Sequence, residues 1–415
     1  MLKNYIKIAF KVLLRRKFFT FISLFGISFT LTVLMVVTAF FDHTFGPMAP
    51  ETQYQRTLAV QFACMYGDDG MWTSSAGYKL LDRYARGLTG VDRLSIFASP
   101  ETVSSYINGQ KVSSSLKRTD GDFWNILQFT FLEGGPYSSQ DVDQAQFVAV
   151  INDATRQRFF GTSPAVGKTI EADGQRFRVV GVVADVSVVR SIPFADVWVP
   201  LTTAKTDTYK RELMGSFNAL ALAHDEAALD HIHDEFNARL AHVEMDNPKV
   251  YKTMVAPFET TFDSYARHLP NADRKSPESQ GWKMVSTLVV LALLFMLLPA
   301  INLMNLNVSR ILERSSEIGV RKAFGASSRT LVGQFVVENI LLTLIGGLIG
   351  LVLSEIALQV VNASNLIEYA HLHLNPRVFL YGLGMALVFG MLSGVYPAWR
   401  MSRLNPVEAL KGATR

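Results

Sequence analysis

The stretch FFTFISLFGISFTLTVLMVVTAFF, residues 18–41, decides the class of fold to which this chain belongs. It runs for 24 residues without an ionisable side chain. A helix needs about 20 apolar residues to cross the roughly 30 Å of hydrocarbon in a bilayer. The run is also longer than that of a cleaved signal peptide, and no small-residue cleavage site follows Phe41. We therefore expect a membrane span that is retained in the mature protein.

Three further stretches have the same character. Residues 284–306 and 378–398 are apolar and free of charged side chains. Residues 331–361 are apolar as well, but they carry Glu338 and Glu355 and are too long for one perpendicular span. The fold class that we predict is a membrane protein with four transmembrane α-helices at 18–41, 282–307, 331–361 and 378–398.

The overall composition agrees with this class and excludes others. Of the 415 residues, 49% are hydrophobic and only 18% are charged, which argues against a disordered chain and against an ordinary soluble enzyme. The net charge of +4 gives no indication of nucleic acid as a partner. The single cysteine, Cys64, excludes an internal disulfide framework and any metal site with several cysteines.

Lysine and arginine indicate the orientation in the membrane, because they accumulate in cytoplasmic segments. Residues 1–17 hold six basic side chains and no acidic one, and residues 308–330 and the tail 399–415 are also rich in basic side chains. Residues 362–377 hold Arg377 as their only basic side chain. We expect both termini and the 308–330 segment in the cytoplasm, and residues 42–281 and 362–377 outside.

The N-terminal segment, residues 1–17, has a pattern of its own. Lys3, Lys7, Lys11 and Arg15 recur every four residues and so share one helical face. Such a helix can lie in the membrane interface with its cations on anionic headgroups. We predict an interfacial amphipathic helix here; the alternative is an ordinary basic flank of the first span.

Residues 42–281 form one large insertion between the first two spans. Residues 146–151 indicate a buried strand, and Asn152 or Asp153 can cap the short helix that follows. The dipeptide Asp173-Gly174 lies between two strand-like runs and predicts a hairpin. These signals predict a mixed α/β (α+β) extracytoplasmic domain that buries its core without disulfides.

No stretch of this domain carries a recognisable catalytic or ligand-binding motif. Gly167-Lys168-Thr169 resembles the end of a phosphate loop, but the preceding glycine is one residue too far away. His231 and His233 are two apart on a predicted helix and so point to different sides, which favours two solvated histidines over a metal site. We also assign no metal to His371 and His373. We expect no catalytic residue, no metal site and no cofactor bound by the chain, which is therefore predicted not to be an enzyme.

Several motifs follow one another in the order found in a known family. They are FVAVI at 147–151, FFG at 159–161, PAVGKTI at 164–170, FRVVGVV at 177–183, ERSSEIGVRKAFGA at 313–326, YPAWR at 396–400 and NPVEAL at 405–410. The first four resemble the periplasmic core domain of MacB-type permeases. The others are similar to the cytoplasmic signature and the ending of the MacB/FtsX permease family.

The resemblance implies a type VII ABC transporter permease in the bacterial inner (cytoplasmic) membrane. It implies an assembly of two permease chains, homodimeric or heterodimeric, with two ATPases that bind ATP and Mg²⁺. The sequence contains no Walker A motif and begins 17 residues before the first span, so we expect the ABC ATPase on a separate polypeptide. In a double-membrane cell, a periplasmic adaptor and an outer-membrane duct are further expected partners.

The cytoplasmic segment 308–330 is the expected contact with the ATPase. Glu317 and Arg321 are four apart and can stabilise a helix by pairing, while Ile318 and Phe324 place apolar side chains among charges. This mixture suits docking into a groove of a partner, although a solvated helix is the alternative. The residues that we assign to ATPase coupling are Glu313, Glu317, Ile318, Gly319, Arg321, Lys322, Ala323, Phe324, Gly325 and Ala326.

Small and polar residues within the spans suggest further roles. Gly346 with Gly350, and Gly390 with Gly394, form small-xxx-small pairs that let helices approach closely. We predict helix packing for all four, either between spans or between protomers. Glu338 is costly inside a bilayer and is a functional candidate for that reason; snorkelling toward the interface is the alternative.

The function that we expect is that of a permease subunit. It would couple ATP hydrolysis by the ATPase to a conformational change outside the membrane, and so export or extract an amphiphilic substrate such as a peptide, lipoprotein or antibiotic. The alternative is an FtsX-like regulator that activates an external cell-wall hydrolase. A membrane-tethered enzyme or sensor is a third hypothesis, for which we find no catalytic constellation and no signalling domain.

Overall fold

The computed structural model describes residues 2–15, 17–68, 70–107, 110–313, 320, 327–364 and 366–402. Its contacts divide the chain into two compact units. The helical unit comprises residues 1–43, 287–366 and 371–415, and the external unit comprises residues 44–286 and 367–370. The external unit thus includes four residues from the connection between the last two long helices.

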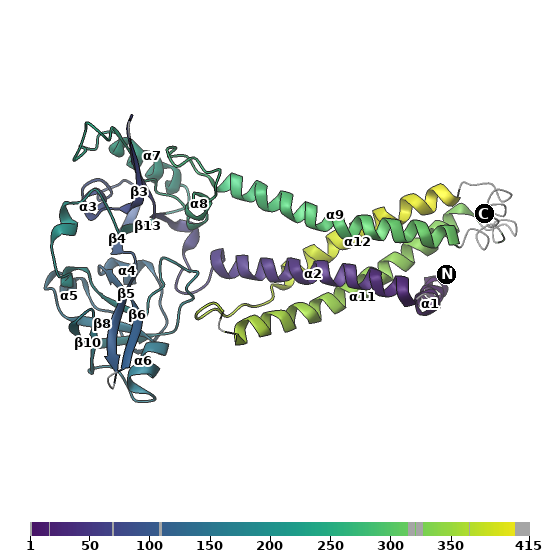
Figure 1. Cartoon of the computed structure of the whole chain (residues 1–415), viewed down its shortest axis with the longest axis horizontal. Coiled ribbons are helices and arrows are strands. Elements are labelled where there is room, and N and C mark those ends of the chain that lie inside the picture. The colour runs from purple at the N-terminus through teal and green to yellow at the C-terminus, as the bar shows by residue number, and fades with distance from the viewer. Residues whose placement is uncertain are drawn as a thin grey trace. The chain divides into compact units, whose positions relative to one another are not determined.

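In the part of the chain that the structure describes, the helical unit contains the short N-terminal helix α1 and most of four long helices (Figure 1). Their bounds are Leu2–Arg15 for α1, Lys17–Phe45 for α2, Gly281–Glu313 for α9, Ser328–Ala363 for α11 and Pro376–Ser402 for α12. Each long helix contains one of the four predicted spans. Among the described residues, 17–45 and 332–363 are apolar and long enough to cross a membrane, whereas the apolar parts described in α9 and α12 are shorter. The count of four spans stays a prediction.

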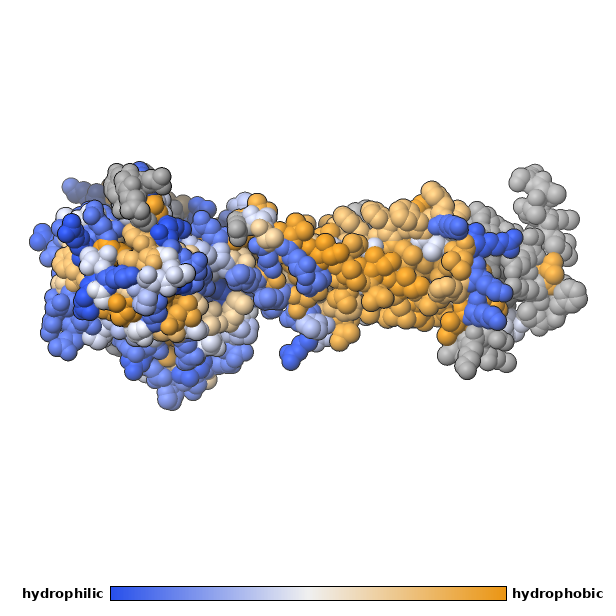
Figure 2. All heavy atoms as spheres, turned by 90° about the horizontal axis from the view of Figure 1, so that it is seen from below, coloured by the Kyte–Doolittle hydropathy of each residue, from blue (hydrophilic) through white to orange (hydrophobic). Residues whose placement is uncertain are grey.

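The surface of the helical unit is apolar over most of its length (Figure 2). Phe21, Phe25 and Phe29 are exposed on α2 and stack on one another at ring distances of 6.2 and 5.7 Å. In α1, Ala9 and Leu13 are buried, while Lys7 and Lys11 are exposed. A coat of exposed apolar side chains is what a bilayer requires of a protein that spans it.

In the part of the chain that the structure describes, the strands of the external unit form two seven-stranded sheets. The first has the order β1-β13-β3-β2-β14, with β12 on β3 and β4 on β13, and every pair is antiparallel. Its strands are β1 (Thr57–Val60), β2 (Ala63–Tyr66), β3 (Met71–Ala76), β4 (Val91–Ala98), β12 (Met214–Gly215), β13 (Phe217–Ala223) and β14 (Thr253–Val255).

The second sheet is mixed and has the order β5-β6-β11-β8-β10-β7, with β9 on β10. The pairs β8–β10 and β6–β11 are parallel, and the others are antiparallel. Its strands are β5 (Glu101–Ile107), β6 (Gln110–Thr119), β7 (Phe131–Gly134), β8 (Val148–Asn152), β9 (Thr169–Ala172), β10 (Gln175–Val183) and β11 (Val197–Pro200). The predicted α/β domain therefore has a mixed sheet around the family motifs and a separate antiparallel sheet.

Short helices cover the sheets of the external unit. They are α3 (Tyr78–Tyr84), α4 (Asp122–Ile126), α5 (Ser139–Asp143), α6 (Asp153–Phe160), α7 (Ala228–Leu240) and α8 (Thr261–Ala266). The predicted cap of α6 is confirmed for Asn152, whose side chain accepts a hydrogen bond from the backbone N–H of Thr155. The predicted hairpin is confirmed too, because β9 and β10 pair across Asp173 and Gly174, both with positive φ.

One apolar cluster joins the two sheets. Phe97 and Leu220 from the first sheet pack with Val148 and Trp198 from the second, and Trp124 of α4 fills the space between them. Fully burying a side chain of this size contributes about 2–3 kcal/mol. The two sheets are therefore joined by this cluster and lie in one compact unit.

Candidate functional site

The last residue of α2 packs against the short helix α8. The ring of Phe45 meets Phe262 and Tyr265 edge to face, with ring centroids 5.3 and 5.2 Å away. Aromatic pairs in this arrangement are favourable beyond the area that they bury. One short helix of the external unit therefore holds the end of α2.

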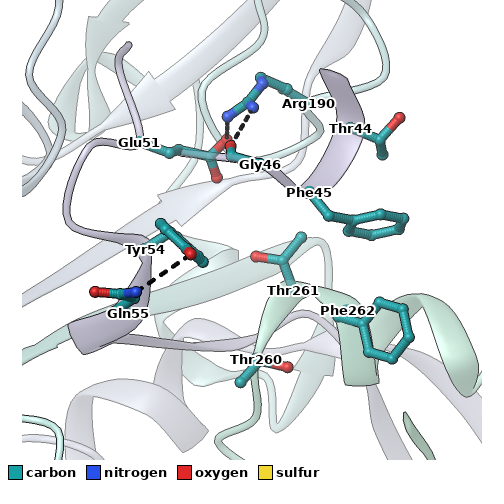
Figure 3. A pocket seen from close by; sticks show the side chains of 10 residues that line it. All are labelled: Thr44, Phe45, Gly46, Glu51, Tyr54, Gln55, Arg190, Thr260, Thr261 and Phe262. Atoms are coloured by element: carbon teal, nitrogen blue, oxygen red, sulfur yellow. Dashed lines mark hydrogen bonds and ion pairs between the residues drawn. The ribbon is translucent and has the colours of Figure 1, made fainter. Parts of the chain in front are cut away.

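Arg190 holds the chain just after α2. Its buried guanidinium donates to Oε2 of Glu51 at 2.7 Å and to the carbonyl oxygen of Gly46 at 2.6 Å (Figure 3). Burial raises the pKa of Glu51, and the charge of Arg190 opposes that shift. Removing one partner of a buried ion pair costs roughly 3–5 kcal/mol, so this pair is a strong constraint on the chain after α2.

The start of α9 is attached to the same helix α8. Thr260 caps α8 by accepting a hydrogen bond from the N–H of Asp263 at 3.1 Å. The Asp263 carboxylate in turn accepts from the hydroxyl of Ser279 at 2.6 Å. Gly281, which begins α9, lies so close to Asp263 that a Cβ atom there would collide with Oδ1. Helix α8 thus contacts both the end of α2 and the approach to α9.

Arg267, directly after α8, also holds the segment that leads into α9. Its side chain is enclosed, and Nε donates to both carboxylate oxygens of Glu259 at 2.9 and 2.7 Å. The other two nitrogens donate to the carbonyl oxygens of Ser276, Pro277 and Glu278 at 2.8, 3.0 and 2.9 Å. These three residues lead into α9, so a single side chain ties that segment to the core of the domain.

Three consecutive residues between β10 and β11, Val188 to Arg190, form hydrogen bonds with three different segments of the chain. The N–H of Val188 donates to the carbonyl oxygen of Glu368 at 3.2 Å, and the carbonyl oxygen of Val189 accepts from the tyrosine hydroxyl of α8 at 2.8 Å. Arg190 binds the chain after α2, as described above. We call residues 187–192 the junction loop, because segments connected to all four long helices bond to it or to the adjoining α8.

Lys117 supports the junction loop from inside the domain. Its ammonium donates to the carbonyl oxygens of Ser191, at 2.9 Å, and of Ile192. The side chain is fully buried, and this burial lowers its pKa to about 7, although the nearby Glu51 carboxylate opposes the shift. The charge that supports the loop is therefore only partly present at neutral pH.

A pocket of about 260 Å³ lies beside these attachments within the external unit (Figure 3). The charged side chains in its wall are already paired with each other. That suits holding segments in place better than acid–base chemistry. Among the described residues, no group of three or more His, Cys, Asp or Glu side chains is placed to hold a metal ion. The lining residues are Thr44, Phe45, Gly46, Glu51, Tyr54, Gln55, Arg190, Thr260, Thr261 and Phe262.

The predicted coupling segment falls almost entirely outside the described residues. Glu313 is the last residue of α9. The remaining residues assigned to ATPase coupling, which are Glu317, Ile318, Gly319 and 321–326, are not among those that the structure describes. Their contact with an ATPase stays a prediction.

Gly346 and Gly350 of α11 face α2. A Cβ atom at Gly346 would lie 2.8 Å from a side-chain carbon of Ile27, and one at Gly350 would lie 3.1 Å from Cβ of Leu31. Real Cβ atoms almost never approach another atom within 3.0 Å, and 3.1 Å is already tight. The missing side chains therefore allow α11 and α2 to approach closely within the helical unit.

The structure describes the surroundings of only some of the other residues predicted to act within the spans. Gly390 and Gly394 lie in α12, but their surroundings are outside the described side chains. Glu338 is only 3% exposed and lies beside the buried Asn339 in α11. A buried carboxylate within an apolar helix is a functional candidate on energetic grounds.

The expectation of two solvated histidines is wrong for one of them. His231 is exposed and lies 3.7 Å from Glu235. His233 is half-buried, and its Nδ1 lies 2.7 Å from the carbonyl oxygen of Phe258. The helix α7 turns this residue toward the neighbouring segment, which a residue count along the helix did not reveal.

Sequence reasoning did not single out the residues of the junction. Arg190 and Glu51 are 139 positions apart, and the hydrogen-bonded Val188 and Glu368 lie in distant segments of the sequence, so no local pattern connects them. The Thr260-x-x-Asp263 cap was the one local signal available, because a hydroxyl followed three residues later by an acid is typical of a helix start.

Two family descriptions match this chain. Residues 20–239 match the MacB-like periplasmic core domain, and residues 289–406 match the FtsX-like permease C-terminal region. Among curated proteins, the macrolide export ATP-binding/permease protein MacB of Wolinella succinogenes is 25% identical over an alignment of 417 positions, which covers 97% of this chain and 60% of that protein. The uncharacterized ABC transporter permease YknZ of Bacillus subtilis is 21% identical over 334 residues, 79% of this chain and 77% of that one.

The chain covers less than two thirds of the length of its MacB relatives, with 44% in the case of MacB of Escherichia coli K12. Solved structures with some similarity include the extracellular domain of YknZ, with a TM-score of 0.35 and 14% identity over 47% of this chain and 97% of that one. The periplasmic region of MacB from Actinobacillus actinomycetemcomitans has a TM-score of 0.33 and 13% identity over 44% and 83%. Because the two sequence matches together span most of the chain, it belongs to the type VII, MacB/FtsX-like family of ABC transporter permeases.

Proposed function

We propose that this chain transmits the cycle of an ABC ATPase across the membrane to its external domain. The movement of that domain exports or extracts an amphiphilic substrate outside the cytoplasmic membrane. The family supports the role of a transporter membrane subunit. The attachments of the external unit support the transmission, since they hold the chain segments that lead to the long helices.

The observation that carries this proposal is the double attachment of α8. Phe45 at the end of α2 packs on it, and Asp263 within it binds Ser279 just before α9. Two helices that are bonded to one element cannot both shift without displacing that element. A movement that starts at the far ends of α2 and α9 is therefore passed to α8 and the core behind it.

The partners follow from the same proposal. An ABC ATPase binds the coupling segment within 308–330 and supplies ATP and Mg²⁺, and a second permease chain completes the dimer. Both termini and this segment lie in the cytoplasm, and residues 42–281 lie outside, as the distribution of basic residues favours. A periplasmic adaptor and an outer-membrane duct extend the path in a double-membrane cell.

Charge reversal in the coupling segment tests the contact with the ATPase. The double variant Arg321→Glu, Lys322→Glu places like charges against a surface that is complementary to the native cations. We expect permease-stimulated ATP hydrolysis by the purified complex to fall about tenfold or more, since each like-charge contact at an interface costs several kcal/mol. Arg377→Glu, on the other side of the predicted membrane, is the matched control and should leave hydrolysis unchanged. Full activity of the double variant would remove the coupling assignment.

Activation of an external cell-wall hydrolase is the competing function. The match of residues 20–239 to a MacB-like periplasmic core domain favours transport, because the domain makes up about half of the chain. The two functions differ in one measurement. ATP-dependent hydrolysis of cell wall by a co-purified hydrolase supports regulation, whereas ATP-dependent release of an amphiphile from membranes supports transport.

A further inference from the structure

Four residues of the connection between α11 and α12 are built into the external unit. Residues 367–370 group with that unit, although Leu366 before them and His371 after them group with the helical unit. The chain therefore enters and leaves the external unit within four residues. A segment of only four residues stays in the external unit only if specific contacts bind it there.

The contacts of this segment are polar and aromatic. Its backbone accepts at Glu368 from the N–H of Val188 in the junction loop at 3.2 Å. The hydroxyl of Tyr369 donates to Oδ1 of Asp196 at 3.0 Å, and its ring lies 6.4 Å from that of Phe194. Tyr369 also has a φ of +59°, which is unfavourable for a bulky side chain and persists only where surrounding contacts impose it.

Asp196 connects this segment to the centre of the second sheet. The carboxylate is buried and accepts from the N–H of Ser115 in β6 at 2.8 Å and from the amide of Asn152 in β8 at 3.2 Å. Asn152 is also the cap of α6. A displacement of Tyr369 therefore displaces the Asp196 carboxylate, and through its hydrogen bonds it affects β6, β8 and the helix α6.

The chain immediately after this segment is bound within the helical unit. Leu372 is buried against Ala39 of α2 and Leu358 of α11. Its N–H and carbonyl oxygen both bond the side chain of Asn362, at 2.9 and 3.0 Å. Only His371 separates this attachment from the last residue of the other one, and one residue spans at most about 3.5 Å. The chain between the two attachments is therefore short.

We propose that residues 367–370 are a third mechanical link, besides the two chain connections through α2 and α9, by which the helices act on the external domain. Tyr369 is its positioning residue, and Asp196 is the group through which it acts. The proposal rests on the transmission function proposed above and specifies its route. Movement of the outer ends of α11 and α12 reaches the mixed sheet through Tyr369 and the junction loop through Glu368.

Two variants separate this role from a merely structural one. Tyr369→Phe removes the bond to Asp196 and keeps the ring. Insertion of Gly-Gly between Ala370 and His371 keeps every bond of both attachments and adds slack. The matched controls are Tyr251→Phe, a half-buried tyrosine elsewhere in the domain, and the same insertion between the exposed Pro248 and Lys249.

Hydrogen exchange of the full chain, reconstituted in nanodiscs with its ATPase, gives the readout. Without ATP, the backbone amides of residues 367–370 should exchange about tenfold faster in Tyr369→Phe than in the wild type, because a hydrogen bond to a charged group is lost. The insertion variant should exchange at the wild-type rate there. With ATP and vanadate, the wild type should change its protection at 187–196. Both variants should lose at least about two thirds of that change while still hydrolysing ATP.

The outcomes distinguish the link from the function on which it rests. If the wild type shows no ATP-dependent change anywhere in the external domain, the proposed transmission fails. If the wild type responds and both variants respond equally well, the transmission stands and the third link is refuted. If only Tyr369→Phe loses the response, the bond of Tyr369 stabilises the external domain but transmits no movement. The Gly-Gly insertion would then lengthen the connection without any effect on the response.

Discussion

The two units of this protein hold their polar groups in opposite ways. In the external unit, charged side chains are buried in pairs or against carbonyl oxygens, as in Arg267 with Glu259 and in Lys117 with the junction loop. In the helical unit, hydroxyl groups donate hydrogen bonds to the backbone carbonyl oxygen one turn earlier in the same helix, as Thr30 does to Gly26 and Thr343 does to Asn339. Where α11 meets α2, glycine allows the two helices to approach closely.

This difference follows from the two surroundings. An aqueous domain can bury a charge if its partners are complete, and an incomplete set is costly. Within lipid there is no hydrophobic force between helices, so close packing of small residues holds them together. Removing a polar partner therefore tests what stabilises the external unit, and adding bulk at a contact between helices tests what stabilises the helical unit.

The largest effect is expected from Arg267→Met. The variant leaves the Glu259 carboxylate, which is 4% exposed, without its cation, and it frees the three carbonyl oxygens before α9. We expect the external unit to lose about 3–5 kcal/mol of unfolding free energy. Urea unfolding of the chain in detergent, followed by tryptophan fluorescence, measures it, because Trp124 and Trp198 lie in the core of that unit.

The control for this prediction is an exposed ion pair in the same unit. Arg86 and Asp82 are about half exposed, so Arg86→Met should cost about 0.5 kcal/mol or less. Equal losses for the two variants would mean that burial does not decide the strength of these pairs, and the contrast between the units would lose its basis.

The next effect is expected from Gly346→Ala in the helical unit. The added methyl group meets Ile27 of α2, and overpacking of this kind costs about 1–3 kcal/mol. Gly384→Ala in α12 is the matched control, because no atom lies within 4 Å of the added carbon. Denaturation of both variants in mixed detergent, followed by circular dichroism, should show a loss for Gly346→Ala alone. A neutral Gly346→Ala would indicate that α11 and α2 tolerate separation.

The smallest effect is a dependence on pH that comes from Lys117. Its pKa is about 7 in the folded protein and 10.5 in the unfolded reference, so unfolding takes up a proton between these values. Stability therefore rises with pH in this window, whereas well below pH 7 Lys117 is charged in both states and its contribution no longer changes with pH. From pH 7 to pH 8 we expect the wild type to gain about 1 kcal/mol relative to Lys117→Met.

The measurement for Lys117 is the difference between the two unfolding curves at each pH, which cancels the other titrating groups. Lys79→Met, at a surface pair with the exposed Asp246, is the control for the loss of a lysine elsewhere in the unit. A parallel response of Lys117→Met and the wild type would show that this lysine stays charged when buried.

The sequence alone allowed prediction of features that depend on neighbouring residues. The four apolar runs correspond to α2, α9, α11 and α12, and the cap at Asn152 and the turn at Asp173 are confirmed because local geometry determines them. The pairing of the strands into two sheets was not predictable, since β13 joins β4 and β1 across more than a hundred residues.

The junction was beyond prediction for the same reason. The loop at 362–377 shows no pattern that distinguishes Tyr369 from any other tyrosine, and its importance arises only when Asp196 is brought to it. Likewise, nothing near Arg190 in the sequence indicates that it binds the chain after α2. Residues that act through distant partners become visible only in the folded chain.

The most direct test of the account is a distance measurement on the working complex. A spin label at the exposed Gln144 reports on the external domain of each permease chain, and Cys64 is buried and does not compete for the label. Pulsed electron resonance then compares the nucleotide-free complex with the complex trapped by ATP and vanadate in nanodiscs. We predict a shift of the label-to-label distance on trapping. An identical distribution in both states, in a complex that hydrolyses ATP, would contradict the claim that this chain carries the ATPase cycle to its external domain.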